Sequence, residues 1–200
     1  MKKLIILGAT AMVIAAFILS CDQQSSKATT TENNTATGIS KDSLIKRGEY
    51  LVTIMSCNDC HSPMGPNHGP DPERLLSGHP ANTPIAPYDT TTAKGYALMG
   101  MTGTAMIGPW GMSFAANLTS DETGIGNWSE EQFRKAFTQG KAKGLDEGRT
   151  LLPPMPWFNF TNIKDEDLKA IFAYLKSTKP VRNVVPGPMP PNELAKYIKK

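Results

Sequence analysis

Two cysteines and a histidine stand within five consecutive residues, Cys57-Asn58-Asp59-Cys60-His61. On a helix, side chains three and four positions apart share one face, so Cys57, Cys60 and His61 would point the same way. The spacing Cys-x-x-Cys-His is typical of c-type haem attachment, in which two thiols bond covalently to one porphyrin and the imidazole binds its iron. The pattern therefore predicts one covalent haem c, with His61 as an axial ligand of the iron.

Two other uses of paired cysteines fit the sequence less well. A structural zinc site needs a second pair of ligands, and the only cysteine outside the motif is Cys21. A thioredoxin-like redox motif needs a strand-helix-strand context, which the hydrophobic pattern around the motif does not show. Haem attachment remains the favoured interpretation.

A second axial ligand is expected on the iron of an electron carrier, and methionine raises the reduction potential. Met155 is the favoured candidate, because it stands in Leu151-Leu152-Pro153-Pro154-Met155-Pro156-Trp157, where prolines restrict the backbone and hold the sulfur at little further entropic cost. The alternative for Met155 is core packing, the common role of methionine. His68 and His79 are rival ligands that would lower the potential, but we expect each in an exposed loop. The remaining methionines form no Met-x-x-Met array and are interpreted as packing around the porphyrin.

The N-terminal residues predict export. Lys2 and Lys3 precede an apolar stretch over residues 4–19, as in a signal peptide, so we assign residues 1–20 to a leader. Residues 18–21, Ile-Leu-Ser-Cys, resemble a bacterial lipobox and predict lipidation of Cys21. Simple cleavage is one alternative, and an uncleaved anchor is another, because the apolar stretch is near the shortest that spans a bilayer. The expected location is the periplasmic or cell-surface side of a bacterial membrane, with a lipid anchor.

The composition divides the rest of the chain into two parts. Residues 21–40 are polar, rich in Ser, Thr and Asn, and without apolar periodicity, which predicts a flexible tether. Residues 41–200 have the size of one domain and include a proline-rich C-terminal extension. The 200 residues contain 21 Lys and Arg against 18 Asp and Glu, and this small excess falls to one without the two leader lysines. Nucleic acid is therefore an unfavourable partner.

Three amphipathic helices are expected in the domain. The first covers residues 42–54 and is capped by Ser40 or Asp42. Its apolar stripe is predicted to contain Leu44, Ile45, Tyr50, Leu51 and Ile54. Gly48 interrupts this helix, and close approach of another helix would explain a glycine there.

The second helix begins with a capping box, Ser129 and Gln132, and ends near residue 139, with Gly140 as the residue that terminates it. The third begins at the acidic run 165–167 and ends before Pro180. Asn192 is a candidate cap for a final turn over residues 193–199.

The long stretch 62–128 has no helical periodicity and is rich in Gly, Pro, Thr and Met. We expect it to wrap the haem as irregular loops, with a short hairpin around residues 96–107.

The placed motifs resemble those of the class I cytochrome c family, and more narrowly the cytochrome domains that accompany membrane-bound alcohol and gluconate dehydrogenases and their monohaem relatives. Three blocks carry the resemblance: the haem motif, residues 117–128 (NLTSDETGIGNW) with the helix after them, and residues 154–157 (PMPW) with the terminal helix. The resemblance implies thioethers at Cys57 and Cys60, His61 as proximal ligand and Met155 as distal ligand. It also implies an all-α fold class, a small helical domain around one haem, in which the first and third helices cross near Gly48 and Tyr174.

Two residues depart from the family pattern, since Ser120 stands where proline is common and Lys164 where a Ser or Thr cap is usual. The function we expect is one-electron transfer between periplasmic or membrane redox partners, namely a dehydrogenase, an oxidase or another cytochrome, with no catalytic side chain. The alternative is that the chain is the haem c subunit of a small-molecule dehydrogenase, or is itself such an oxidoreductase. A haem sensor is a third class, disfavoured because no output domain accompanies the haem motif.

Overall fold

The computed structural model describes residues 40–88, 95–194 and 196. The predicted leader, Cys21 and the tether up to residue 39 lie outside the described residues, as does the end of the predicted final turn. Among the helices of the described ranges, none combines the length and the hydropathy that crossing a bilayer requires.

The first helix, α1, runs over Lys41–Ile54, and the Ser40 hydroxyl accepts a hydrogen bond from the Ser43 N–H at 3.2 Å. Ser40 is therefore the cap. The predicted apolar stripe was too wide, because Tyr50 and Ile54 are 55% and 57% exposed. Gly48, Leu51 and Val52 face the core. At 100° per residue, Tyr50 falls on the opposite side of the helix and Ile54 falls beyond the edge of the buried face.

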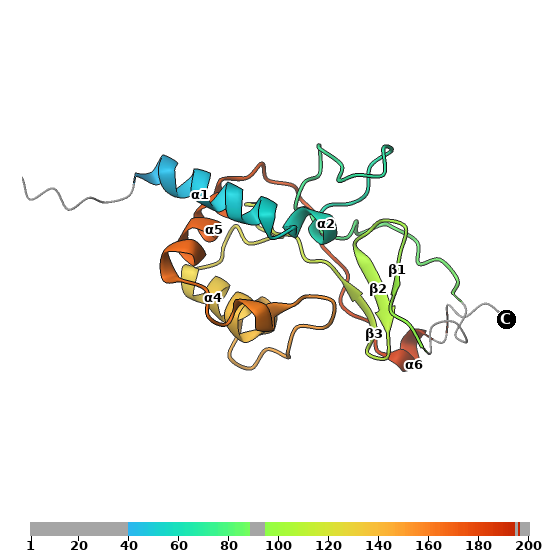
Figure 1. The fold of residues 1–200 in the computed structure, drawn as a ribbon. Helices are drawn as coiled ribbons and strands as arrows, with labels where there is room; N and C mark the ends of the chain where they lie inside the picture. The colour runs from blue at the N-terminus through green and yellow to red at the C-terminus, as the bar shows by residue number, and fades with distance from the viewer. Residues whose placement is uncertain (1–39, 89–94, 195, 197–200) are drawn as a thin grey trace, which may run out of the picture. The chain divides into compact units, whose positions relative to one another are not determined.

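Helix α5, Asp165–Ser177, lies beside α1 (Figure 1) and crosses it at Gly48. A Cβ atom at Gly48 would overlap the carbonyl oxygen of Ala170 and would lie 2.7 Å from the Tyr174 Cβ. The predicted reason for Gly48 and the predicted crossing point are both confirmed. Lys164 precedes α5 without any side-chain capping hydrogen bond, as expected of a lysine at that position.

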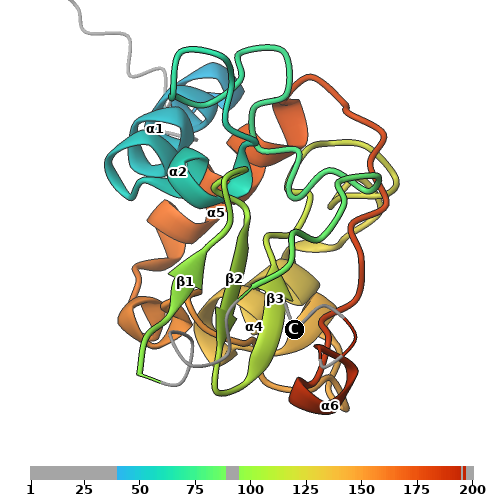
Figure 2. The same cartoon turned by 90° about the vertical axis from the view of Figure 1, so that its right-hand side faces the viewer.

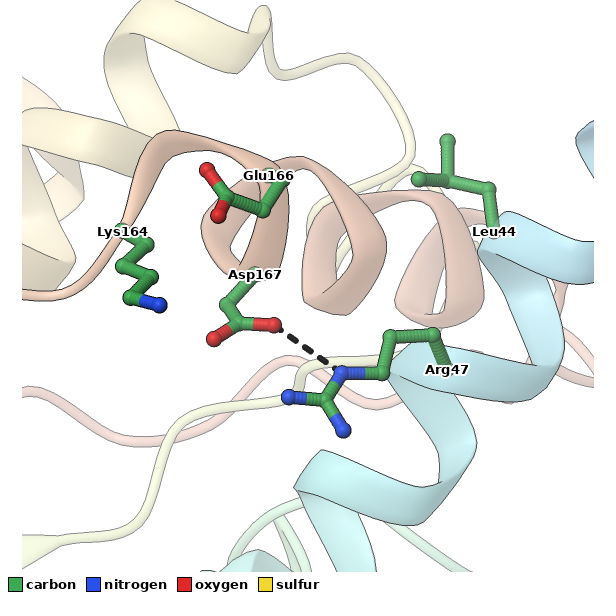
Figure 3. A pocket seen from close by; sticks show the side chains of 5 residues that line it. All are labelled: Leu44, Arg47, Lys164, Glu166 and Asp167. Carbon is green, nitrogen blue, oxygen red and sulfur yellow. Dashed lines mark hydrogen bonds and ion pairs between the residues drawn. The ribbon is translucent and has the colours of Figure 1, made fainter. Parts of the chain in front are cut away.

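One end of this crossing carries an ion pair, in which Arg47 Nε donates to Asp167 Oδ1 at 3.0 Å. Figure 3 shows the pair at a small pocket, with Leu44 on α1 and Glu166 in the first turn of α5. The volume of this pocket is about 250 Å³. Because the Arg47 side chain is half exposed, solvent and salt screen the pair, and packing at Gly48 is the stronger determinant of this contact.

Helix α4, Glu130–Gln139, has the predicted capping box between Ser129 and Gln132, and Gly140 ends it in the left-handed region at φ 65°. Its buried face carries Phe133 and Phe137. The Phe133 ring stacks on Phe172 of α5 with 5.3 Å between centroids, and the Phe137 ring stacks on Phe160 at 4.5 Å. These rings join α4 to the core between α1 and α5.

A three-stranded antiparallel sheet corrects the all-α expectation, and the fold is mixed. The strands are β1 (Leu98–Met99), β2 (Ala105–Gly108) and β3 (Gly111–Phe114), in the order β1-β2-β3. Figure 1 shows the sheet on the side of the domain away from α1, α4 and α5. The predicted hairpin is β1 with β2, but the pattern missed β3, because strands of two to four residues are too short for alternation to be read.

The chain after α5 returns along the domain to the sheet, as Figure 2 shows. Met189 exchanges two backbone hydrogen bonds with Met112 of β3, at 2.8 and 2.9 Å. Helix α6 then covers Pro191–Leu194. It begins before Asn192, so that residue lies inside the helix rather than at its cap. The remaining short elements are α2 (Cys57–His61) and the 3₁₀ turns η1 (Ala142–Gly144) and η2 (Trp157–Phe160).

Candidate haem-binding site

The two motif cysteines and the histidine lie together on α2, a helix of five residues. Ser56 precedes it in the left-handed conformation at φ 57°, which separates α2 from α1 with a sharp turn. Cys57 and Cys60 are both free and partly buried. Burial raises the pKa of the Cys57 thiol to about 11 and also raises the pKa of Cys60, so both are protonated thiols near neutral pH.

The imidazole of His61 is oriented by a backbone carbonyl. Its Nδ1 lies 2.8 Å from the carbonyl oxygen of Ala116, and because a carbonyl only accepts, Nδ1 carries the proton and donates it. Burial lowers the pKa of His61, although the Ala116 carbonyl acts in the opposite direction. The neutral ring therefore has its lone pair on Nε2, which is the arrangement of a metal-binding histidine.

Met155 lies in the loop between η1 and η2 and is partly buried. Its side chain packs against the hydrophobic core that is built from Leu51, Phe137 and other buried residues, and the same core contacts Cys57. At the start of η2, directly after this loop, the Trp157 ring lies against Gly140, where any Cβ atom would overlap it. The predicted attachment site and the predicted distal methionine thus border one apolar core.

The rival histidines have different surroundings. His68 is exposed, as expected, at a turn with φ 59°. His79 corrects the expectation, because it is only 3% exposed, its Nδ1 lies 2.9 Å from Thr104 Oγ1, and its ring centroid is 4.7 Å from that of Phe114. Burial lowers the pKa of His79. Its partners are Phe114 of β3 and Thr104 in the turn before β2. The sequence pattern had not predicted β3.

The other methionines of the described residues range from exposed to buried, and Met55, Met106 and Met189 are partly buried. Met64, Met99 and Met101 are exposed, and Met112 is buried under the C-terminal segment. Within the described part of the chain, no three His, Cys, Asp or Glu side chains gather closely enough to hold a metal ion. The pocket beside Arg47 contains none of the predicted haem ligands.

Comparison with known proteins identifies relatives of this chain. No protein-family model matches it. The chain is 34% identical over 134 residues to the gluconate 2-dehydrogenase cytochrome c subunit of Pantoea cypripedii. It is 32% identical over 142 residues to the cytochrome c subunit of the alcohol dehydrogenase (quinone) of Gluconobacter oxydans. Homologues of this chain are therefore cytochrome c subunits of dehydrogenases.

These matches cover 66% and 70% of this chain but only 23% of each relative. A third relative is the fructose dehydrogenase cytochrome subunit of Gluconobacter japonicus, which is 30% identical over 139 residues. That match covers 68% of the chain and 22% of the relative. The chain therefore spans less than a quarter of the length of these curated relatives.

The cytochrome c homologues imply haem c, and the donor set fits that group. Two free thiols and a histidine with an available Nε2 lie on one helical turn, beside an apolar core that also contacts a methionine. Asn117, the first residue of the second block of the family resemblance, uses its side-chain amide for hydrogen bonds within the protein. Its Nδ2 donates to the Val181 carbonyl at 2.8 Å, and its Oδ1 accepts from the Thr119 hydroxyl at 2.7 Å.

The carbonyl of Ala116 is the site group that sequence reasoning missed. Every residue carries a backbone carbonyl, so no residue type or spacing marks the one that orients His61. Its location one position before Asn117, at the edge of the second block of the family resemblance, is the nearest signal that the sequence offered.

Proposed function

We propose that this cytochrome c domain is a one-electron carrier that holds one haem through thioethers at Cys57 and Cys60, with His61 as proximal ligand and Met155 as distal ligand. The single observation that carries the proposal is the 2.8 Å contact between His61 Nδ1 and the Ala116 carbonyl. It assigns the tautomer with a free Nε2 on a ring that covalent attachment at the neighbouring Cys60 would hold under the porphyrin.

The chain's own residues set the conditions for electron transfer. When bound, the haem supplies an iron that exchanges one electron between its Fe(II) and Fe(III) states. His61 offers a neutral imidazole and Met155 a neutral thioether, so neither ligand needs to gain or lose a proton when the charge of the iron changes. The core that both ligand segments border excludes water from one side of the site and favours a small reorganisation.

The names of the relatives support a dehydrogenase as the electron donor. Two of them are cytochrome c subunits, of a gluconate dehydrogenase and of an alcohol dehydrogenase. We place this domain as a carrier that accepts electrons from such an enzyme and passes them to an oxidase or another cytochrome, through small transient interfaces. The second candidate, favoured by the same names, is a haem c subunit that stays bound to its dehydrogenase. A chain that is itself a small-molecule oxidoreductase would need an open distal position, which Met155 would occupy.

The proposal also includes export of the protein and its attachment to a membrane by a lipid. Residues 1–20 act as the signal peptide, Cys21 carries the lipid, and residues 21–40 tether the domain to the periplasmic or cell-surface side of a bacterial membrane. A tether of this length reaches roughly 25 Å, enough for the domain to meet neighbouring membrane enzymes.

The test of attachment is mass spectrometry of the exported full chain under denaturing conditions. We expect the wild-type mass to include one haem and the Cys57→Ala/Cys60→Ala double variant to lack it. Cys21→Ser is the matched cysteine control, expected to keep the haem and lose the lipid. Wild-type protein that releases its haem into acidified organic solvent would contradict covalent attachment.

A further inference from the structure

A side chain of the sheet holds the loop that carries Met155. Ser113 of β3 is 9% exposed, and its hydroxyl donates to the carbonyl oxygen of Pro153 at 2.6 Å, across 40 residues of sequence. Pro153 is two residues before Met155. The position of the loop is thereby coupled to the position of the strand.

The loop has few means of anchoring its own backbone. Pro153, Pro154 and Pro156 have no N–H to donate. Across residues 40–88, 95–194 and 196, the bond from Ser113 is the one hydrogen bond that joins the backbone of residues 152–156 to a distant part of the chain. The residues on either side of this segment are held separately. The Leu151 N–H donates to the Gly140 carbonyl at 2.7 Å, and the Trp157 ring packs against Gly140.

The Ser113 hydroxyl is itself oriented. Trp110 Nε1 donates to Ser113 Oγ at 3.3 Å, which leaves the hydroxyl proton free to be donated. Two carbonyls are within reach, that of Pro153 at 2.6 Å and that of Met106 at 3.4 Å, and the shorter bond takes the proton. β3 is paired with β2 on one edge and with Met189 on the other, so Ser113 stands on a strand that is fixed on both sides.

We propose that Ser113 is a positioning residue for the distal ligand, holding the Met155 thioether on the iron through the Pro153 carbonyl. The inference rests on the proposed role of Met155. Removing the hydroxyl leaves a carbonyl without its donor and releases the middle of the loop. The thioether should then leave the iron more often, because no other hydrogen bond in the described structure ties the backbone of residues 152–156 to the sheet.

The test compares three variants of the haem-loaded full chain: Ser113→Ala, Ser120→Ala and Met155→Ala. Ser120 is a matched control, since its hydroxyl also donates to a backbone carbonyl at 2.6 Å, that of Thr178 at the end of α5. The readouts are the weak long-wavelength charge-transfer band of thioether-ligated ferric haem, carbon monoxide binding to the ferrous form, and the thermal midpoint.

We expect Ser113→Ala to weaken the band and to raise the apparent carbon monoxide affinity about fivefold, the equivalent of one net hydrogen bond. Ser113→Ala and Ser120→Ala should lower the thermal midpoint by similar amounts, because each loses one hydroxyl-to-carbonyl hydrogen bond. Ser120→Ala should leave both haem readouts unchanged. Equal haem readouts for wild type, Ser113→Ala and Ser120→Ala would overturn the inference. A Met155→Ala variant that keeps the band would instead overturn the ligand assignment on which the inference rests.

If Ser113→Ala does not accumulate with haem, Trp110→Phe decides the question. This variant keeps the serine and removes only the indole N–H that orients its hydroxyl. A rise in carbon monoxide affinity smaller than that of Met155→Ala, in the same direction, supports the inference, and an unchanged affinity contradicts it.

Discussion

Gly48 of α1 contacts the backbone of α5 so closely that any side chain there would overlap the carbonyl oxygen of Ala170. The contact joins two helices that are more than a hundred residues apart in sequence. The first of them, α1, lies directly before the haem motif. Because α2 follows α1 after a single turn, the crossing also fixes where the motif begins relative to the core.

Substituting Gly48→Ala should therefore destabilise the domain. The overlap is with a backbone atom that cannot rotate away, and overpacking of this kind costs about 3 kcal/mol at the upper end of its usual range. The helix propensity of alanine offsets up to about 1 kcal/mol. We expect the free energy of unfolding, measured by denaturant titration of the haem-loaded protein, to fall by about 2 kcal/mol.

Gly187→Ala is the control for this prediction, because a Cβ at Gly187 meets no atom within 4 Å. It should unfold with the wild-type midpoint. A Gly48→Ala variant as stable as Gly187→Ala would show that α1 and α5 do not pack as closely as the structure has them.

Asn117→Ala should loosen the C-terminal segment. The amide of Asn117 bonds both to the Val181 carbonyl and to Thr119, and Asn117 is buried, so its loss leaves buried polar groups without partners at a cost of about 2 kcal/mol. Hydrogen exchange should accelerate at the amides of Val181 and Asn183 and stay slow within α4. Asn127→Ala, at an exposed position, should leave exchange in both regions unchanged, and equal protection in the two variants would refute the structural role of Asn117.

The burial of His79 predicts a loss of stability in acid. Burial lowers the pKa of His79 in the folded state below its ordinary value of about 6.5. The unfolded chain therefore binds the proton more readily, so the contribution of His79 to stability is complete above about pH 6.5 and declines as the pH falls below that value. The free energy of unfolding should decrease between pH 7 and 5.

The variant that isolates this effect is His79→Asn, which keeps a polar group facing Thr104 and removes the titration. Its free energy of unfolding should fall less steeply between pH 7 and 5 than that of wild type. His68→Asn changes an exposed histidine and should keep the wild-type slope. A His79→Asn slope identical to that of wild type would contradict the assignment.

The parts of the fold that the sequence predicted well are those decided by neighbouring residues. The capping box of α4 depends on Ser129 and Gln132, three positions apart, and the end of the helix depends on Gly140, so local chemistry suffices. The burial of His79 depends instead on Thr104 and on Asn183, whose amide donates to the His79 carbonyl from 104 residues away. No local pattern contains that information.

The candidate site divides in the same way. Cys57, Cys60 and His61 could be proposed from the sequence because the chemistry requires them within five residues, and their roles in holding the haem stay predictions. Met155 was selected by its proline-rich surroundings, and its ligand role stays a prediction. The contacts of Ala116 with His61 and of Ser113 with Pro153 depend on chain folding over 55 and 40 residues, so only the structure reveals them.

The most direct test of the central claim is a spectroelectrochemical titration of the exported full chain beside Met155→Ala. We predict a single one-electron transition for wild type, a long-wavelength thioether band in the oxidised form, and no carbon monoxide binding in the reduced form. Met155→Ala should lose the band, bind carbon monoxide and titrate at a lower potential. A wild-type protein that lacks the band and binds carbon monoxide readily would have an open distal position, and would contradict the electron-carrier account.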